Sequence, residues 1–293
     1  WPCGIPRLSP GWSRLPSPPW LDVIVALEPC MITSPDNPRV KQARALLEPK
    51  GRREQGRCLV EGVRLIEEAM RAGHSPALVF FTGQAQQNQR AAELLRAVEK
   101  LNVPAEELSP SLFGTLSDTV ASQGVIAILP IPRVTLPLEA GLILVLDQIR
   151  DPGNLGTILR GAEAAGVLRV VLTPGCVDPW NPKVVRSGMG AHFRLPLVAA
   201  GSWVAVADLV AGRSVWVADA RGATPYDAVD WTGPCALVIG GEAAGPSAEA
   251  EQLGTGRVMI PMAGPVESLN AAMAATVLVF EAARQRRHAL SLR

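Results

Sequence analysis

The stretch LDQIRDPGNLGTILRGAEAAGV, residues 146–167, predicts the end of a buried strand, a polar turn and an amphipathic helix. Polar side chains crowd the turn: Asp147, Arg150, Asp151 and Asn154. The apolar face of the helix follows the i, i+3, i+4, i+7 spacing through Leu155, Ile158, Leu159, Ala162 and Ala165. We expect Asn154 to be the helix N-cap, because the apolar period begins at the next residue. A cap does not explain the neighbouring charges or the lone Arg160, so we interpret the turn as one wall of an active site.

The composition indicates a folded chain without a large excess of charge. At 293 residues the chain is long enough for one large domain or two ordinary ones, and 48% hydrophobic residues exclude a mostly disordered protein. The net charge of +1 gives no global basic field for a nucleic-acid partner. The longest apolar-rich run, residues 271–280, is far shorter than the roughly 20 residues of a membrane span, so we expect no membrane segment.

Cysteine and histidine usage argues against a disulfide framework and a metal centre. The five cysteines are scattered, odd in number and without a CxxC pair. The three histidines show no spacing typical of metal ligands. We therefore expect no bound metal and a reducing, cytoplasmic location.

One segment of the chain is locally basic. Residues 39–57 hold seven Lys or Arg against two Glu. Both a solvated helix face and a surface for RNA backbone agree with this pattern. The side chains that we predict to contact RNA are Arg39, Lys41, Arg44, Arg52 and Arg53.

The chain divides into two α/β units. Residues 1–30 hold seven of the 26 prolines and three of the seven tryptophans, which predicts a disordered or non-native extension with Met31 as the natural start. Residues 31–130 alternate helices and strands and predict a small, mostly parallel sheet. Residues 131–139 are proline-rich and predict a linker. Residues 140–293 repeat the alternation more strongly.

In the second unit, three polar loops follow predicted buried strands. Apolar runs predict strands at 142–146, 169–173, 215–218, 236–239 and 258–261, and periodicity predicts helices at 155–165, 203–211 and 270–287. The polar loops are 147–154, the glycine-rich 239–246 with Glu242, and 260–270, which ends in Ser268 and Asn270. Because ligands of parallel α/β sheets bind beyond the carboxyl ends of the strands, these loops predict one ligand site.

Several common chemistries lack their signature here. The dinucleotide fingerprint GxGxxG is absent after the first strand of either unit, and no phosphate loop GxxxxGK(S/T) occurs, which disfavours a nucleotide-dependent oxidoreductase. The chain also lacks the GxSxG elbow of serine hydrolases. The three loops instead suit a nucleoside-like ligand held by backbone groups in a partly apolar slot.

In order and spacing, the three loops resemble the motifs of the SpoU (TrmH-type) RNA 2′-O-ribose methyltransferases. Residues 151–160 resemble the first motif, 240–245 the second and 260–270 the third. Residues 182–196 also match the family between its first two motifs. Residues 31–130 are similar to the ribosomal-protein-like substrate-binding domain that often precedes the catalytic domain.

The resemblance implies a fold, a reaction and a set of site residues. The fold is an α/β parallel-sheet domain whose C-terminal segment, about 240–287, threads into a trefoil knot, and members are usually homodimers. The reaction is methyl transfer from S-adenosyl-L-methionine to a ribose 2′-OH of structured RNA. The family's catalytic positions fall on Asn154, Arg160, Glu242, Ser268 and Asn270, and its cofactor positions on Gly240, Ile260, Met262 and Leu269.

Three questions stay open at this point. Ribosomal RNA is the favoured substrate because a separate domain precedes the catalytic one, and transfer RNA is the alternative. A non-catalytic RNA-binding protein with the same fold is a further reading, against which the complete catalytic set counts. The family often gives Arg160 the role of general base, but a guanidinium only donates hydrogen bonds. Fixing the target phosphate and ribose suits Arg160 better, with Glu242 orienting it.

Overall fold

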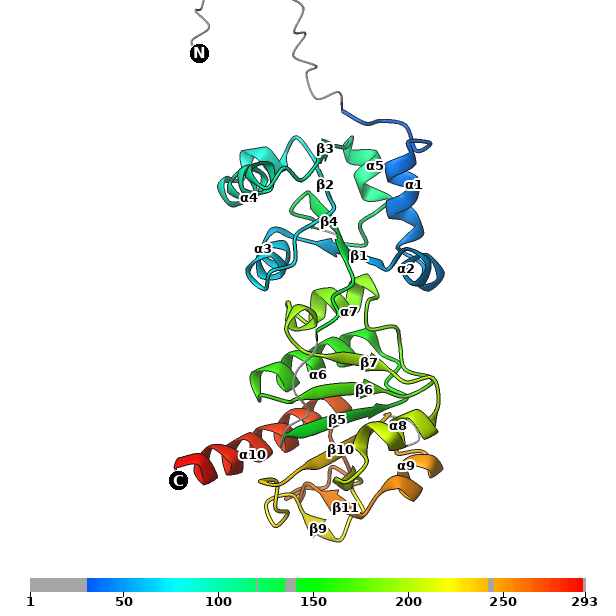
Figure 1. The fold of residues 1–293 in the computed structure, drawn as a ribbon, viewed down its shortest axis with the longest axis vertical. Helices are drawn as coiled ribbons and strands as arrows, with labels where there is room; N and C mark the ends of the chain where they lie inside the picture. The colour runs from blue at the N-terminus through cyan, green and yellow to red at the C-terminus, as the bar shows by residue number, and fades with distance from the viewer. Residues whose placement is uncertain (1–30, 120, 135–140, 242–244, 292–293) are drawn as a thin grey trace, which may run out of the picture. The chain divides into compact units, whose positions relative to one another are not determined.

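The structure is a computed structural model that describes residues 31–119, 121–134, 141–241 and 245–291. The predicted extension at 1–30 and most of the predicted linker lie outside the described residues. Two sheets organise the described chain, one formed by strands before residue 131 and one by strands after residue 141 (Figure 1). No described helix is long and apolar enough to cross a membrane.

The first sheet has four strands in the order β1-β4-β2-β3. Its strands are β1 (Arg57–Glu61), β2 (Leu78–Phe81), β3 (Ala105–Glu107) and β4 (Val125–Pro130). The helices of this unit are α1 (Pro38–Ala45), α2 (Pro49–Gln55), α3 (Val63–Arg71), α4 (Gln89–Lys100) and α5 (Pro110–Gly114), with a 3-10 turn η1 (Ala85–Gln87).

Strand β4 corrects the expectation of a mostly parallel first sheet. The strands β1, β2 and β3 share one direction, but β4 lies between β1 and β2 and runs against both. Two of the three strand pairings are therefore antiparallel. The apolar run at 124–129 predicts a strand buried on both faces, as β4 is, but such a run carries no sign of the strand's direction.

Alternation along β4 sorts the core of this unit into two layers. Val125, Ala127 and Leu129 pack with α3 and α4. Ile126 and Ile128 point the other way and pack with α1 and α5. This period of two is what a strand covered by helices on both faces requires.

The second sheet has seven strands, all parallel, in the order β7-β6-β5-β10-β8-β11-β9. Its strands are β5 (Leu142–Asp147), β6 (Arg169–Leu172), β7 (Leu197–Ala199), β8 (Ser214–Ala218), β9 (Thr224–Pro225), β10 (Cys235–Gly240) and β11 (Gly256–Met259). The predicted parallel α/β sheet is confirmed. The short strands β7 and β9 lie at its two edges and were not predicted from the apolar runs.

Helices cover both faces of the second sheet (Figure 1). Leu142, Leu144 and Leu146 of β5 pack with α6 (Pro152–Ala164) and α10 (Ala271–Ser291). Ile143 and Val145 point to the opposite face, where α8 (Trp203–Val210) and α9 (Ala248–Leu253) lie.

A short segment at residues 182–193 packs against both units. Helix α7 (Pro182–Ser187) contacts both α6 and β1, and the 3-10 turn η2 (Ala191–Phe193) follows it. Val185 and Phe193 from this segment are buried in the core of the first sheet. The segment therefore packs against the helix of the first motif and against the sheet of the first unit.

Candidate active site

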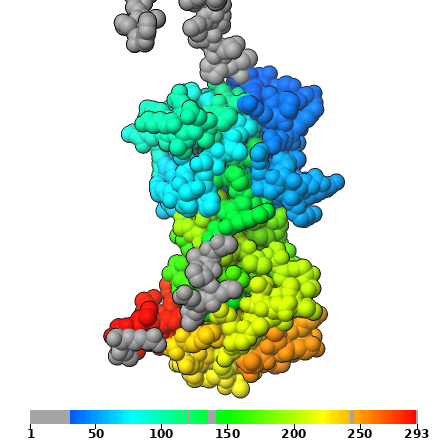
Figure 2. Space-filling model, viewed as in Figure 1, coloured from blue at the N-terminus to red at the C-terminus, as the bar shows by residue number. Residues whose placement is uncertain are grey.

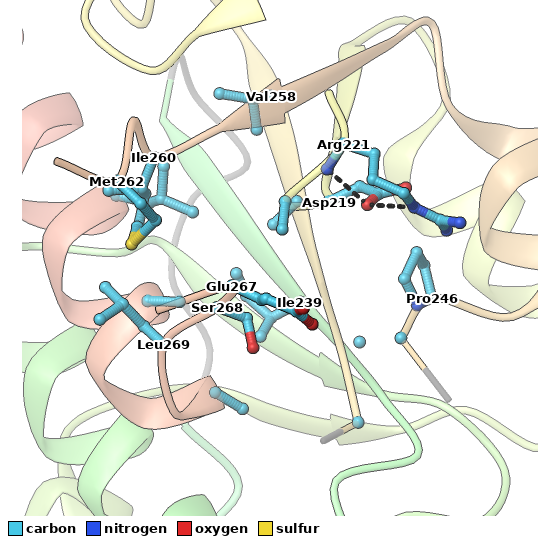
Figure 3. Close-up of a pocket in the computed structure, with 18 residues that line it drawn as sticks. Asp219, Arg221, Ile239, Pro246, Val258, Ile260, Met262, Glu267, Ser268 and Leu269 are labelled. Atoms are coloured by element: carbon cyan, nitrogen blue, oxygen red, sulfur yellow. Dashed lines mark hydrogen bonds and ion pairs between the residues drawn. The ribbon is translucent and has the colours of Figure 1, made fainter. Parts of the chain in front are cut away.

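A cavity of about 450 Å³ opens at the carboxyl ends of three neighbouring strands. Its walls come from the ends of β8, β10 and β11 and from the first turns of α10 (Figure 3). The lining residues are Ala218–Arg221, Ile239–Gly241, Gly245, Pro246, Val258, Ile260, Met262, Glu267–Leu269, Ala271, Ala274 and Leu278. The predicted convergence of two of the polar loops on one edge of the sheet is thus present in the structure.

The four predicted cofactor positions all line this cavity. Ile260, Met262 and Leu269 contribute apolar side chains (Figure 3). Gly240 contributes backbone at the end of β10. Ser268, predicted as catalytic, lines it as well. Sequence reasoning therefore located the residues of this wall, although their roles remain proposals.

Gly240 lets the chain fold back tightly at the end of β10. A Cβ at this position would lie 2.4 Å from the backbone nitrogen of Pro246 and 2.5 Å from the carbonyl carbon of Gly245. Both are backbone atoms, which no side-chain movement can relieve. Any side chain at Gly240 would therefore displace the 245–246 segment that forms part of the cavity wall.

Asp147 has a structural role in the turn after β5. Its side chain is almost fully buried, with 1% exposed. One carboxylate oxygen accepts the backbone N–H of Ser247 at 2.7 Å, and the other accepts the Thr173 hydroxyl at 3.2 Å. This carboxylate ties the ends of β5 and β6 to Ser247 at the start of α9.

The first motif begins its helix three residues earlier than expected. Asp151 is the N-cap of α6, and its Oδ1 accepts the backbone N–H of Asn154 at 2.7 Å. Pro152 follows at the first helical position, where its missing N–H costs nothing. The expectation that Asn154 is the cap is therefore wrong. Its side chain is not used to cap α6.

The side chain of Asn154 instead forms a hydrogen bond with Asn270 of the third motif. Asn270 Nδ2 donates to Asn154 Oδ1 at 3.2 Å. Asn270 Oδ1 accepts from the backbone N–H groups of Ala272 and Met273, at 2.9 Å and 3.3 Å, and so caps α10. Two residues predicted as catalytic, 116 positions apart in the sequence, are thus in direct contact.

Arg160 lies on the exposed side of α6 and does not line the cavity. Its guanidinium is therefore accessible to a large ligand. Glu242, the predicted partner of Arg160, lies outside the described residues. Of the five predicted catalytic residues, the structure places Ser268 in the cavity wall, Asn270 two residues later in the chain, and Asn154 against Asn270.

Asp219 and Arg221 line the cavity without having been predicted. Asp219 Oδ1 accepts the Arg221 backbone N–H at 2.9 Å and its Nε at 3.4 Å (Figure 3). Burial opposes ionisation of Asp219, but these bonds and the charges of Arg221 and Arg257 keep its pKa below its ordinary value. A lone aspartate after a strand is common in turns, so the sequence carried no signal for this pair.

Arg52 corrects the predicted RNA-binding set. Its side chain is 1% exposed, and its Nη2 lies 2.7 Å from Asp178 Oδ2. Its Nη1 donates to the carbonyl oxygens of Leu46 and Leu47, both at 2.8 Å. A guanidinium committed in this way cannot reach an RNA backbone, because burial removes it from the surface.

The other four predicted RNA contacts lie at the surface or are half-buried. Helices α1 and α2, drawn in blue, form part of the molecular surface (Figure 2). Arg39 and Lys41 form ion pairs with Glu106 and Asp36. Exposed pairs of this kind are weak and can exchange for phosphate contacts. Arg44 is half-buried and donates to the Thr115 hydroxyl at 3.2 Å, and Arg53 is exposed.

Family models match both units of the chain. The model described as the SpoU rRNA Methylase family matches residues 141–280, and the one described as the MRM3-like substrate binding domain matches residues 37–127. The first range includes the cavity and α6, and the second includes the described chain from α1 to the first half of β4.

Relatives with curated names match over most of their length. The chain is 35% identical to rRNA methyltransferase 3, mitochondrial, of Homo sapiens, covering 86% of this chain and 74% of that protein. It is 32% identical to the 23S rRNA (guanosine(2553)-2′-O)-methyltransferase RlmP of Bacillus subtilis, covering 85% of this chain and 97% of that protein.

A solved structure agrees with the fold. The SpoU methyltransferase AviRb from Streptomyces viridochromogenes, in complex with the cofactor AdoMet, superposes with a TM-score of 0.76 at 35% identity, over 86% of this chain and 98% of that one. Together with the family models, the arrangement of the cavity and the relatives, this likeness assigns the chain. It belongs to the SpoU rRNA methylase family.

Proposed function

We propose that this protein methylates a ribose 2′-hydroxyl of ribosomal RNA with S-adenosylmethionine as the methyl donor. The observation that carries the proposal is the cavity at the ends of β8, β10 and β11, whose wall holds all four predicted cofactor positions. The relatives named above are rRNA methyltransferases, and the name of the Bacillus subtilis relative specifies 2′-O-methylation.

The cavity fits this cofactor in size and chemistry. Its volume of about 450 Å³ lies within the usual range of small-molecule sites. Ile260, Met262 and Leu269 suit the faces of an adenine ring, and the backbone at Gly240 and Gly241 suits polar edges. The bound cofactor supplies an activated methyl group on a sulfonium. The protein's main task is then to align a ribose 2′-hydroxyl with it.

We assign the RNA side of the reaction to the first motif. Arg160 is exposed and carries a permanent charge, so it is suited to hold the phosphate next to the target ribose. Asn154 and Asn270 hold the starts of α6 and α10 together, and Ser268 lies in the cavity wall. The proposed orientation of Arg160 by Glu242 involves a residue outside the described part of the chain.

We propose residues 31–130 as the RNA substrate-binding domain, 131–139 as the linker and 140–293 as the methyltransferase domain. The match to a substrate-binding model at 37–127 supports the first of these. Within it, Arg39, Lys41, Arg44 and Arg53 are the proposed contacts to RNA backbone. Arg52 is left out because it is buried.

We also propose a homodimer and a trefoil knot in the segment 240–287, as the family resemblance implies. The described surface supports the dimer on α10. Met273 and Phe280 are 60% and 41% exposed, seven residues apart and so on one face of this helix. A second copy would remove this apolar face from water.

A reducing compartment such as the cytoplasm is the proposed location. Cys58, Cys176 and Cys235 are free thiols, two of them buried, and a reducing environment keeps thiols in this form. The name of the human relative places that protein in mitochondria.

Mapping of ribose methylation tests the proposal directly. Total RNA from cells lacking the gene should lose methylation at one ribosomal site, and the purified protein with S-adenosylmethionine should restore it on that RNA. Loss at a transfer RNA site would replace ribosomal RNA by the alternative substrate. Unchanged methylation in both RNA classes would contradict the proposed activity.

A further inference from the structure

Asp219 places a buried carboxylate in the wall of the cavity. Its side chain is 6% exposed, and it follows the last residue of β8. Its Oδ1 is used by the turn, where it accepts from the backbone N–H and the Nε of Arg221. Its Oδ2 is buried and has no hydrogen-bond partner among the described residues.

An unpaired acceptor of this kind is unusual in a folded protein. Buried polar side-chain atoms almost always have a hydrogen-bond partner, because leaving one unpaired forfeits its hydration without compensation. The pKa of Asp219 lies below its ordinary value, so the group is a carboxylate at neutral pH and can only accept. Oδ2 therefore lacks a donor among the described residues, and Asp219 lines the cavity that a ligand would enter.

The charges around Asp219 indicate what kind of donor is missing. Arg221 bonds Oδ1, and Arg257 Nη1 lies 3.5 Å from Oδ2, beyond a good hydrogen bond. Asp219 therefore already has two cationic neighbours, although Arg257 is shared with Glu251, whose Oε1 lies 3.0 Å from Arg257 Nη2. A third cation, such as an ammonium group, would meet their repulsion and would also lose its own hydration. A neutral hydrogen-bond donor avoids both penalties, and because the adenine with its amino group suits the apolar side of the cavity, a hydroxyl is the donor that remains.

S-adenosylmethionine carries two neutral O–H groups, both on its ribose. We propose that Asp219 Oδ2 accepts a hydrogen bond from a ribose hydroxyl of the bound cofactor, an inference that rests on the proposed function. The apolar side chains of Ile260, Met262 and Leu269 then hold the adenine on one side of the cavity, and the carboxylate holds the sugar on the other (Figure 3). This adds a side-chain contact to a site otherwise rich in backbone groups.

Calorimetric binding tests the contact without any methyl transfer. The probes are S-adenosylhomocysteine, 5′-methylthioadenosine, and the 2′-deoxy and 3′-deoxy forms of 5′-methylthioadenosine. Asp219→Ala should bind the first two about 10- to 100-fold more weakly than the native protein, as expected for a lost bond to a charged group. For one of the two deoxy forms, the native protein and the variant should bind equally.

Asp230→Ala is the matched control. Asp230 Oδ1 accepts the N–H of Thr232 at 2.9 Å, the same two-residue turn that Asp219 makes with Arg221, but Asp230 is exposed and does not line the cavity. Asp230→Ala should lose about as much thermal stability as Asp219→Ala and should keep the native affinity for all four probes. Equal loss of affinity in both variants would mean that the turn, not Oδ2, matters, and would overturn the inference.

Three further outcomes test the inference and, separately, the proposed function. A loss that appears with S-adenosylhomocysteine but not with 5′-methylthioadenosine would place the contact on the amino-acid end and overturn the ribose assignment. If Asp219→Ala does not fold, the native protein still decides, since both deoxy probes binding as well as the parent would exclude a hydroxyl contact. Failure of the native protein to bind S-adenosylhomocysteine would refute the proposed function itself.

Discussion

Asn270 Nδ2 donates to Asn154 Oδ1 across 3.2 Å, and this bond joins the starts of the two helices that lie side by side on one face of the second sheet. The two residues of this bond have different structural roles. Asn270 also caps α10, whereas Asn154 is the third residue of α6, which Asp151 caps. The capping function and the bridging function can therefore be separated by substitution.

Asn270→Asp should keep the cap and lose the bridge. An aspartate accepts the two N–H groups of α10 and favours the positive end of the helix dipole, but it cannot donate to Asn154. We expect the free energy of unfolding to stay within about 0.5 kcal/mol of the native value. The rate of methyl transfer should fall at least 10-fold. Urea unfolding and single-turnover methylation measure the two effects.

Ser202→Ala is the control for a pure cap. Ser202 caps α8 through the N–H of Ala205 and lies far along the chain from either motif. It should lose about 1 kcal/mol of stability and keep native activity. Native activity in Asn270→Asp would show that the bridge between the motifs is dispensable.

Arg160→Ala should separate RNA handling from cofactor binding. The side chain is exposed and does not line the cavity, so stability should change by less than about 0.5 kcal/mol and the affinity for S-adenosylhomocysteine should not change. Methyl transfer should fall by about 100-fold or more if Arg160 both holds the phosphate and aids the chemistry. Weaker RNA binding with native transfer at saturating RNA would reduce its role to an anchor.

Arg52 and Arg53 are neighbours with opposite expected effects. Arg52→Leu breaks a buried ion pair and removes two bonds to carbonyl oxygens, so it should destabilise the protein by about 3 kcal/mol in urea unfolding. Arg53→Ala should leave stability unchanged, because its side chain is exposed. In a plot of log RNA affinity against log salt, Arg53→Ala should lower the slope by about one unit. Native RNA binding in Arg53→Ala would remove it from the proposed contact surface.

His192 predicts loss of stability in mild acid. It is buried between Trp180 and the Pro179 carbonyl, which accepts from its Nε2 at 2.8 Å. Burial lowers its pKa from 6.5 to about 4, against opposing contributions from the Pro179 bond and the Asp178 charge. The unfolded chain therefore takes up the proton first as pH falls. The contribution of His192 to the free energy of unfolding is complete above pH 6.5. It falls by about 3 kcal/mol as the pH drops from 6.5 to about 4.

His192→Gln isolates this contribution. Its amide can still donate to the Pro179 carbonyl but does not titrate, so its stability should fall less steeply than the native one between pH 7 and 4. His288→Gln, at an exposed histidine of α10, should follow the native curve. Parallel curves for the native protein and His192→Gln would show that His192 is not buried in its neutral form.

The sequence predicted those parts of the fold that depend on local pattern. The apolar runs at Leu142–Leu146 and Ala236–Ile239 are the two adjacent central strands β5 and β10, because a strand covered by helices on both faces must be apolar throughout. The start of α6 was predicted three residues too late because the prediction followed the apolar period. The Asp151-Pro152 pair, which is typical of an N-cap followed by the first helical position, marks the actual start.

Other features depend on distant contacts that no local pattern records. Arg52 stands in a basic run, and only Asp178, 126 positions later, makes it a buried structural residue. Asp219 is distinguished by two features of the folded chain. Its Oδ2 has no hydrogen-bond partner among the described residues, and it lines a cavity formed by three strands and a helix. The proposed cofactor positions were named because they match motifs of a known family, and the structure shows that they line the cavity. Physical reasoning alone predicted only the loops.

The central place of β4 has a consequence for how the protein is made. Strand β1 pairs only with β4 within the described sheet, so it stays without a partner until residues 125–130 have left the ribosome. By then the whole preceding unit has already been synthesised, with β2 and β3 as a separate pair. The first sheet therefore closes in one late step, just before β5, the first strand of the second sheet, emerges. A nascent chain stopped at residue 120 should therefore be digested by protease. One stopped after residue 194 with its end clear of the ribosome should resist, because it also supplies Asp178 to Arg52 and Val185 and Phe193 to the core of the first unit.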